Sequence, residues 1–301
     1  MSDNSYFYFM KDKLTGRLFY WFICYSFFLI SCNPQIADGV RKSNLKHDVE
    51  LTTEYGSIVF RLYDNTPLHR NNFLKLVNQQ FYDSILFHRV INNFLIQTGD
   101  PESKQANAEV SLGNGDLPYQ IPAEINAINF HKRGAVNAAR TGDLENPEQA
   151  SSSTQFTFIQ RKPLSDSLIQ VAENRINYYK AYNKVIKQSA NQKLVAHLRR
   201  LSAADKPIDS ISGYEKQLNL LVKQELETME RYRIPEAQKQ VYRTLGGSPH
   251  LDQNYTVFGE VVKGMDVVDK IAAVQTRKSD DRPLKDVRIL SVRLIKRKDY
   301  Q

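Results

Sequence analysis

Short runs in which apolar and polar residues alternate occur in two parts of the chain, and they predict β-strands. Residues 49–53 alternate in this way, a turn follows at 54–57, and β-forming residues fill 58–63. This pattern predicts a β-hairpin. Further short apolar runs predict strands at residues 85–90, 94–97, 135–139, 156–159, 255–261 and 287–295. Because these parts contain few helical patterns, one starting at Pro67 and one at Met265, they favour a mainly β barrel or sandwich.

A different periodicity occupies residues 164–245. Apolar and aromatic residues recur there every three or four positions, for example from Leu168 to Tyr182, which predicts helices. The strand pattern resumes afterwards, so we expect a helical insertion in a β domain made of residues 48–163 and 246–301. The insertion holds fourteen Lys or Arg and nine Asp or Glu, so it carries most of the chain's net charge of +8.

The N-terminus has the pattern of a secretory signal. Basic residues between positions 11 and 17 precede an uncharged run over 18–30, which is shorter than the about 20 residues of a membrane-spanning helix. Leu29-Ile30-Ser31-Cys32 resembles the lipobox of bacterial lipoproteins, which implies cleavage before Cys32 and a diacylglycerol on its sulfur. We therefore expect a signal peptide at 1–31 and a tether at 32–47. The alternative is a buried N-terminal helix with an incidental cysteine.

Composition and charge narrow the partners of the chain. A lipid on Cys32 would anchor the protein to a membrane of the bacterial cell envelope, and we expect the folded part to face the periplasm. The net charge of +8 favours anionic partners such as phospholipid headgroups. Nucleic acid is not expected, because a secreted protein rarely meets it. The two cysteines cannot form a zinc site, and the six histidines are too far apart in sequence to suggest a metal.

Five segments resemble, in the same order, those of cyclophilin-type peptidyl-prolyl cis-trans isomerases. They are FHRVINNFLIQTGDP at 87–101, IPAE at 121–124, GAVNAAR at 134–140, STQF at 153–156, and HLD at 250–252 with YTVFG at 255–259. The resemblance implies a closed eight-stranded antiparallel barrel capped by two helices, here carrying an α-helical insertion. With the lipobox, the chain is similar to membrane-anchored isomerases of Gram-negative bacteria.

The reaction of this family needs no cofactor. An X-Pro amide rotates over a barrier of about 18–20 kcal/mol, because its C–N bond has double-bond character. A guanidinium that donates to the prolyl nitrogen localises the lone pair and lowers this barrier. The resemblance implies that Arg89 is the catalytic arginine, that Gln97 binds the substrate amide, and that Phe94 forms the floor of the proline pocket.

The resemblance also implies a substrate groove lined by Ala139, Arg140, Gln155, Phe156, Thr157, His250, Leu251 and Tyr255. Thr157 stands where many members have an aromatic residue, so we expect a shallower proline pocket and reduced turnover. Less specific interpretations stay open. Arg89 resembles any surface arginine in a weak ion pair, Phe94 and Leu251 resemble core residues, and Gln97 suits a strand end.

Two functions follow from these residues. The first is an isomerase that rotates X-Pro bonds in exported, unfolded or Pro-containing polypeptides and assists their folding, as Arg89 favours. The second is a non-catalytic chaperone or binding module that holds Pro-containing clients, as Thr157 favours. The resemblance implies that 164–245 replaces a short loop between two groove-lining segments, so both of its ends should lie beside the groove. We therefore expect a helical hairpin or small bundle that enlarges the client surface. The alternative is an appendage that only adds stability and exposes a basic face.

Overall fold

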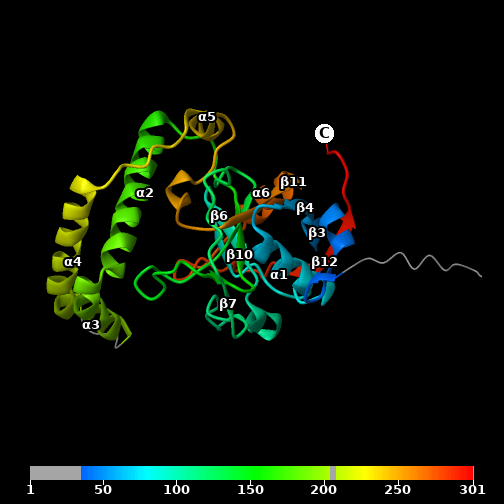
Figure 1. Cartoon of the computed structure of the whole chain (residues 1–301). Helices are drawn as coiled ribbons and strands as arrows, with labels where there is room; N and C mark the ends of the chain where they lie inside the picture. The colour runs from blue at the N-terminus through cyan, green and yellow to red at the C-terminus, as the bar shows by residue number, and fades with distance from the viewer. Residues whose placement is uncertain (1–34, 204–207, 301) are drawn as a thin grey trace, which may run out of the picture. The chain divides into compact units, whose positions relative to one another are not determined.

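The computed structural model describes residues 35–203 and 208–300. The expected signal peptide at 1–31 and the lipidated Cys32 lie outside these residues. Residues 34–301 belong to one compact unit, which contains the sheet and the helical segment (Figure 1). Among the described residues, no helix combines the length and the apolar character needed to cross a membrane.

Eight strands form one antiparallel sheet, as the resemblance implies. Their order is β12-β3-β4-β11-β8-β10-β6-β5. The strands are β3 (His47–Thr53), β4 (Gly56–Leu62), β5 (Arg89–Ile91), β6 (Leu95–Thr98), β8 (Ala135–Ala138), β10 (Phe156–Ile159), β11 (Val257–Lys263) and β12 (Ile289–Lys296). A separate two-stranded sheet pairs β7 (Gln120–Ile121) with β9 (Ser151–Ser152). The mainly β class is therefore confirmed.

The two edge strands, β5 and β12, do not pair with each other, so the strand pairing gives an open half-barrel. The segment before β5 nevertheless reaches the start of β12. The N–H groups of Ser84 and Phe87 donate to the carbonyls of Ile289 and Val287, both at 2.9 Å. A closed barrel stays a prediction.

Helices α1 (Pro67–Asn78) and α6 (Met265–Ala272) pack against the apolar core of the sheet. Aromatic rings fill this core. The ring of Phe73 in α1 lies edge-on to Phe156 at 5.1 Å, and Phe60 lies edge-on to Phe158 at 5.4 Å. Such pairs add about 0.5–1.5 kcal/mol each beyond their burial. Their packing fixes β4 and β10 relative to α1, and therefore fixes the strands that carry the candidate site.

The folded part begins earlier than expected. Residues predicted as a tether form β1 (Gln35–Ala37), β2 (Val40–Arg41) and a 3-10 helix (Lys42–Lys46). Val40 is fully buried in the main core, and the Asn78 side chain donates to the Gly39 carbonyl at 2.9 Å. The tether prediction is therefore wrong for residues 35–47, because they form regular secondary structure and residues 38–41 contact α1.

The segment 164–245 is helical, as predicted. Its helices are α2 (Asp166–Lys187), α3 (Gln192–Ala203), α4 (Ile208–Thr228) and α5 (Glu236–Thr244), and α4 packs against both α2 and α3 (Figure 1). Val185, Val195 and Val222 lie in an apolar cluster of their own between these helices. Glu173 of α2 is buried and accepts hydrogen bonds from the Arg233 side chain at 2.7 Å and the Ile234 N–H at 3.0 Å.

The two ends of the helical segment lie together. The Leu164 N–H donates to the Tyr242 carbonyl at 3.0 Å. The Tyr242 hydroxyl donates to the buried Asp252 carboxylate at 2.6 Å, and the other oxygen of that carboxylate accepts from the His131 N–H at 2.9 Å. Gly246 has φ +98, and a Cβ there would lie 2.3 Å from the Arg161 carbonyl oxygen. This close approach requires a glycine.

Candidate active site

One row of side chains crosses four neighbouring strands on the face of the sheet opposite to its aromatic core. Arg89 in β5 lies opposite Gln97 in β6, Gln97 lies opposite Thr157 in β10, and Thr157 lies opposite Asn137 in β8. Paired residues project to the same side of a sheet, so this row shares one face. The sheet register thus brings together two predicted residues, Arg89 and Gln97, that lie eight positions apart.

The Arg89 guanidinium is positioned by two side chains. Its Nη1 donates to Gln97 Oε1 at 3.4 Å, and its Nε lies 3.8 Å from Asp281 Oδ2. The Arg89 side chain is 42% exposed, so donor groups of its guanidinium stay accessible to a ligand. The sequence analysis missed Asp281, because no local pattern links it to Arg89 across so long a stretch of chain.

A chain of hydrogen bonds fixes the Gln97 amide. Gln97 Nε2 donates to Gln155 Oε1 at 3.0 Å, and Gln155 Nε2 donates to the carbonyls of Gly113 and Gly115 at 3.0 and 2.7 Å. The buried Asp100 carboxylate holds this glycine loop by accepting from the Gly113 N–H at 2.6 Å. The polar end of the site is therefore preorganised by a loop that the sequence analysis did not assign.

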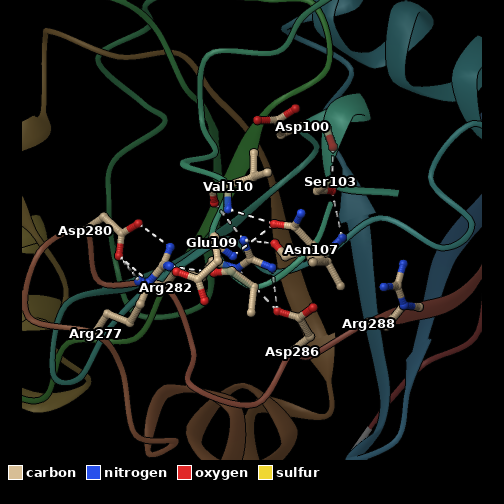
Figure 2. Close-up of polar contacts among 12 residues, drawn as sticks. Asp100, Ser103, Asn107, Glu109, Val110, Arg277, Asp280, Arg282, Asp286 and Arg288 are labelled. Atoms are coloured by element: carbon tan, nitrogen blue, oxygen red, sulfur yellow. Dashed lines mark hydrogen bonds and ion pairs between the residues drawn. The ribbon is translucent and has the colours of Figure 1, made fainter. Parts of the chain in front are cut away.

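The loop that contains Gly113 and Gly115 is also held at residues 107–110, by a segment at 277–286 (Figure 2). The fully buried Arg282 donates to the carbonyls of Asn107 and Val110 at 3.0 and 2.8 Å and pairs with Asp286 at 2.9 Å. Arg277 donates to a further loop carbonyl, that of Ala108, at 2.6 Å. This segment also contains Asp281, so one structural unit supports both the loop and Arg89.

The apolar end of the site gathers three predicted residues. Phe94 and Leu251 are partly buried against Leu95, Ala135, Ile159 and Val257. The Phe94 ring lies 5.5 Å from the His250 ring. Burial, together with the charges of nearby arginines, lowers the pKa of His250 to about 3, so its ring is neutral near neutral pH. The structure thus provides an apolar patch beside the polar row.

Arg140 and Tyr255 form one wall. The Arg140 guanidinium lies 4.5 Å from the centre of the Tyr255 ring, donates to the Asn254 carbonyl at 2.9 Å and pairs with Asp143. The Arg140 side chain is thus engaged within the protein. The Ala139 N–H donates to the Gln155 carbonyl at 3.0 Å, just beyond the ends of β8 and β10, so it is engaged as well.

The position of Phe156 corrects the predicted groove. Its ring is buried in the aromatic core and contacts Phe73, because it alternates with Gln155 and Thr157 along β10. Phe156 is therefore a core residue rather than a groove residue. Thr157 lies on the groove face, but it is buried, and its hydroxyl donates to Asn137 Oδ1 at 2.5 Å. Asn137 is a further groove-face residue to which the sequence analysis gave no role.

One cavity adjoins the polar row, and a second adjoins the apolar patch. One of about 160 Å³ is lined by Gln97, Ala139 and Gln155, and one of about 290 Å³ is lined by Leu251 and Tyr255. The second cavity is also lined by α2, a contribution that the sequence analysis did not locate. In the part of the chain that the structure describes, no three His, Cys, Asp or Glu side chains converge to hold a metal ion.

Comparisons with known proteins identify the family of the chain. The family model of cyclophilin type peptidyl-prolyl cis-trans isomerases matches residues 48–212 and 223–294. A protein of Staphylococcus aureus strain USA300 named "Putative peptidyl-prolyl cis-trans isomerase" is 25% identical over 260 residues, 86% of this chain and 96% of its own, and one of Staphylococcus haemolyticus strain JCSC1435 gives the same values. A solved cyclophilin type isomerase of Cryptosporidium parvum, determined with the dipeptide Ala-Pro, is 17% identical over 83% of this chain and 99% of its own, with a TM-score of 0.45. The chain belongs to the cyclophilin-type peptidyl-prolyl cis-trans isomerases.

Proposed function

We propose that this isomerase acts on Pro-containing segments of unfolded, exported polypeptides, and that Arg89 is its catalytic residue. Rotation about an X-Pro bond transfers no proton and breaks no bond to a leaving group, so the enzyme has only to stabilise the twisted amide. A guanidinium donor at the prolyl nitrogen does this, because the nitrogen lone pair is localised in the transition state.

The observation that carries this proposal is the half-exposed Arg89 guanidinium, oriented by Gln97 and Asp281 on the face of the sheet that also holds an apolar patch. The patch at Phe94 and Leu251 suits a prolyl ring, whose burial supplies binding energy. The Gln97 amide suits a backbone group of the substrate. We infer that the hydrogen bonds between 84–87 and 287–289 also close the barrel behind Arg89, which would stiffen β5.

The exported context rests on the N-terminal sequence. The basic flank, the apolar run at 18–30 and Cys32 support a lipid anchor in the bacterial cell envelope, facing the periplasm. The test is detergent phase partitioning of the full chain expressed in a Gram-negative bacterium, beside Cys32→Ser. We expect the wild type in the detergent phase and the variant in the aqueous phase. Equal partitioning of both would contradict the anchor.

The catalytic proposal is tested by turnover of Xaa-Pro tetrapeptides with the full chain in detergent micelles. Arg89→Ala should lower kcat/KM by about 100-fold or more, the effect typical of removing one transition-state donor. Arg293→Ala is the matched control, because Arg293 is 43% exposed and also pairs with one aspartate, Asp83, but lies on β12. Equal activity of Arg89→Ala and Arg293→Ala would refute the role of Arg89.

A second function, holding Pro-containing clients without catalysis, is favoured by Thr157. A threonine buries less apolar area against a prolyl ring than an aromatic residue does, so the ring would be held less firmly during rotation. If wild-type turnover is at background while Pro-containing peptides still bind, this second function replaces the first. Thr157→Phe would then be expected to raise turnover.

A further inference from the structure

Helix α2 presents a stripe of side chains of which only the last, Tyr182, also packs against the apolar cluster of the insertion. Leu168, Val171, Arg175, Tyr179 and Tyr182 are spaced by three or four positions, so they follow one face of the helix. We call these five residues the α2 stripe. Leu168 is 45% exposed and Val171 is 61% exposed, although both are large apolar residues. Such exposure at neighbouring helical positions is typical of an interaction surface.

The α2 stripe is continuous with the prolyl site. The cavity of about 290 Å³ has the two tyrosines of the stripe on one side and Leu251 and Tyr255 on the other. A second cavity of about 170 Å³ lies along the first half of the stripe. Arg175 and His250 line both cavities. One path therefore leads from the apolar patch of the site along α2.

The charges along this path are unbalanced. Within residues 35–203 and 208–300, neither Arg161 nor Arg175 lies at ion-pair distance from a carboxylate, and Arg161 Nε is buried without a hydrogen-bond partner. The centre of the Arg175 guanidinium lies 5.6 Å from the Tyr179 ring, and its Nη2 donates to the Tyr179 hydroxyl at 3.5 Å. The neutral His250 ring between them adds no charge. Asp143 and Glu145 line the larger cavity, whereas no described carboxylate lines the smaller one. An acidic group would therefore be attracted to the smaller cavity.

We propose that the α2 stripe binds the client segment that flanks the isomerised proline, with an apolar or aromatic side chain on the stripe and a carboxylate at Arg161 and Arg175. The stripe extends over fourteen helical steps, about 21 Å at 1.5 Å per residue. An extended segment of about six residues covers this length at about 3.3–3.6 Å per residue. The inference rests on the proposed function, because it deepens the substrate class of the same site.

The test compares short and long peptides with the full chain in detergent micelles. The probes are the tetrapeptide Ala-Ala-Pro-Phe and two octapeptides that carry Leu, Glu and Phe either after or before a single Ala-Pro. Isomerisation is followed by NMR exchange, and binding by fluorescence anisotropy of labelled peptides. In Arg175→Glu we expect kcat/KM to fall about tenfold for the octapeptide whose Leu, Glu and Phe lie on the side of the proline that reaches α2. This loss is at the lower end of what a close charge pair across an interface contributes. Tetrapeptide turnover should change less than about twofold.

Lys180→Glu is the matched control, since it makes the same charge change on an exposed face of α2 outside the stripe. Val171→Asp is a second variant that should weaken octapeptide binding without altering tetrapeptide turnover. Equal effects of Arg175→Glu and Lys180→Glu, or no effect on either octapeptide, would overturn the inference. If the wild type lacks tetrapeptide turnover, the proposed function fails, and weaker octapeptide binding by Arg175→Glu still supports the α2 stripe.

Discussion

His88, next to Arg89, predicts a defined loss of stability in acid. The His88 side chain is buried, and neither of its ring nitrogens has a hydrogen-bond partner among the described residues. Burial lowers the pKa of His88 to about 4, and the positive charges of Arg89 and Arg282 add to this effect, whereas Asp100 opposes it. The folded protein therefore keeps a neutral imidazole at a pH where an unfolded chain binds a proton.

The sign and size of the effect follow from linkage. The pKa of a histidine in an unfolded chain is about 6.5. Between this value and the folded value of about 4, the unfolded state binds more protons, so the free energy of unfolding falls as the pH falls. The contribution of neutral His88 to the free energy of unfolding is fully present above a pH of about 6.5. It is lost as the pH falls to about 4, and the loss amounts to about 3 kcal/mol, at about 1.4 kcal/mol for each pH unit.

The assay is urea unfolding of the wild type and of His88→Phe between about pH 7.5 and pH 4.5. Phenylalanine fills the buried site and cannot take up a proton. Carboxylates with lowered pKa values, such as those of Glu124 and Glu173, also lower the free energy of unfolding when they are protonated in acid. They do so equally in both proteins, so their effect cancels in the difference. We expect His88→Phe to gain about 2 to 3 kcal/mol relative to the wild type over this range. Parallel pH curves for the two proteins would refute the reasoning.

Two further changes test the supports of the site. In Gly115→Ala the new methyl would lie 2.1 Å from Asp100 Oδ1, so the loop that holds Gln155 must shift and tetrapeptide turnover should fall; unchanged turnover would contradict this support. In Tyr242→Phe the buried carboxylate of Asp252 loses its hydroxyl donor, which should lower the free energy of unfolding by about 1–3 kcal/mol in urea, and wild-type stability would show that the bond contributes nothing.

The strands and helices could be predicted because each carries its own periodicity. Residues 156–159 and the helices within 164–245 appear where the apolar spacing predicts them. The prediction of an N-terminal tether was wrong because the residues concerned carry no such periodicity. Residues 35–47 contain few apolar residues, without a regular spacing, so they give no periodic signal, and Val40 is buried because it packs into the main core beside α1. Closure of the barrel depends on long-range contacts that no local pattern contains.

The candidate site was predictable only as far as the motif extends. Arg89 and Gln97 lie in one hairpin, so a local motif brings them together. Asp281 comes from a distant part of the chain, so its place beside Arg89 needed the fold. The error at Phe156 was avoidable, because successive residues of a strand face opposite sides and Gln155 was already assigned to the groove. The motif alone does not state which side each residue faces.

The insertion is attached to the catalytic region in a way that decides how its role can be tested. Leu144, in the loop beside the groove, packs on the apolar cluster of the insertion, and Arg199 of α3 donates to its carbonyl at 2.5 Å. Tyr242 holds the buried Asp252 from the other end. Deleting 164–245 would remove these contacts, including the Tyr242 donor to one oxygen of the buried Asp252 carboxylate, so loss of activity would report folding as much as client binding. The Arg175→Glu variant keeps all of these contacts. If it slows isomerisation of an octapeptide but not of a tetrapeptide, a client segment must lie on the α2 stripe.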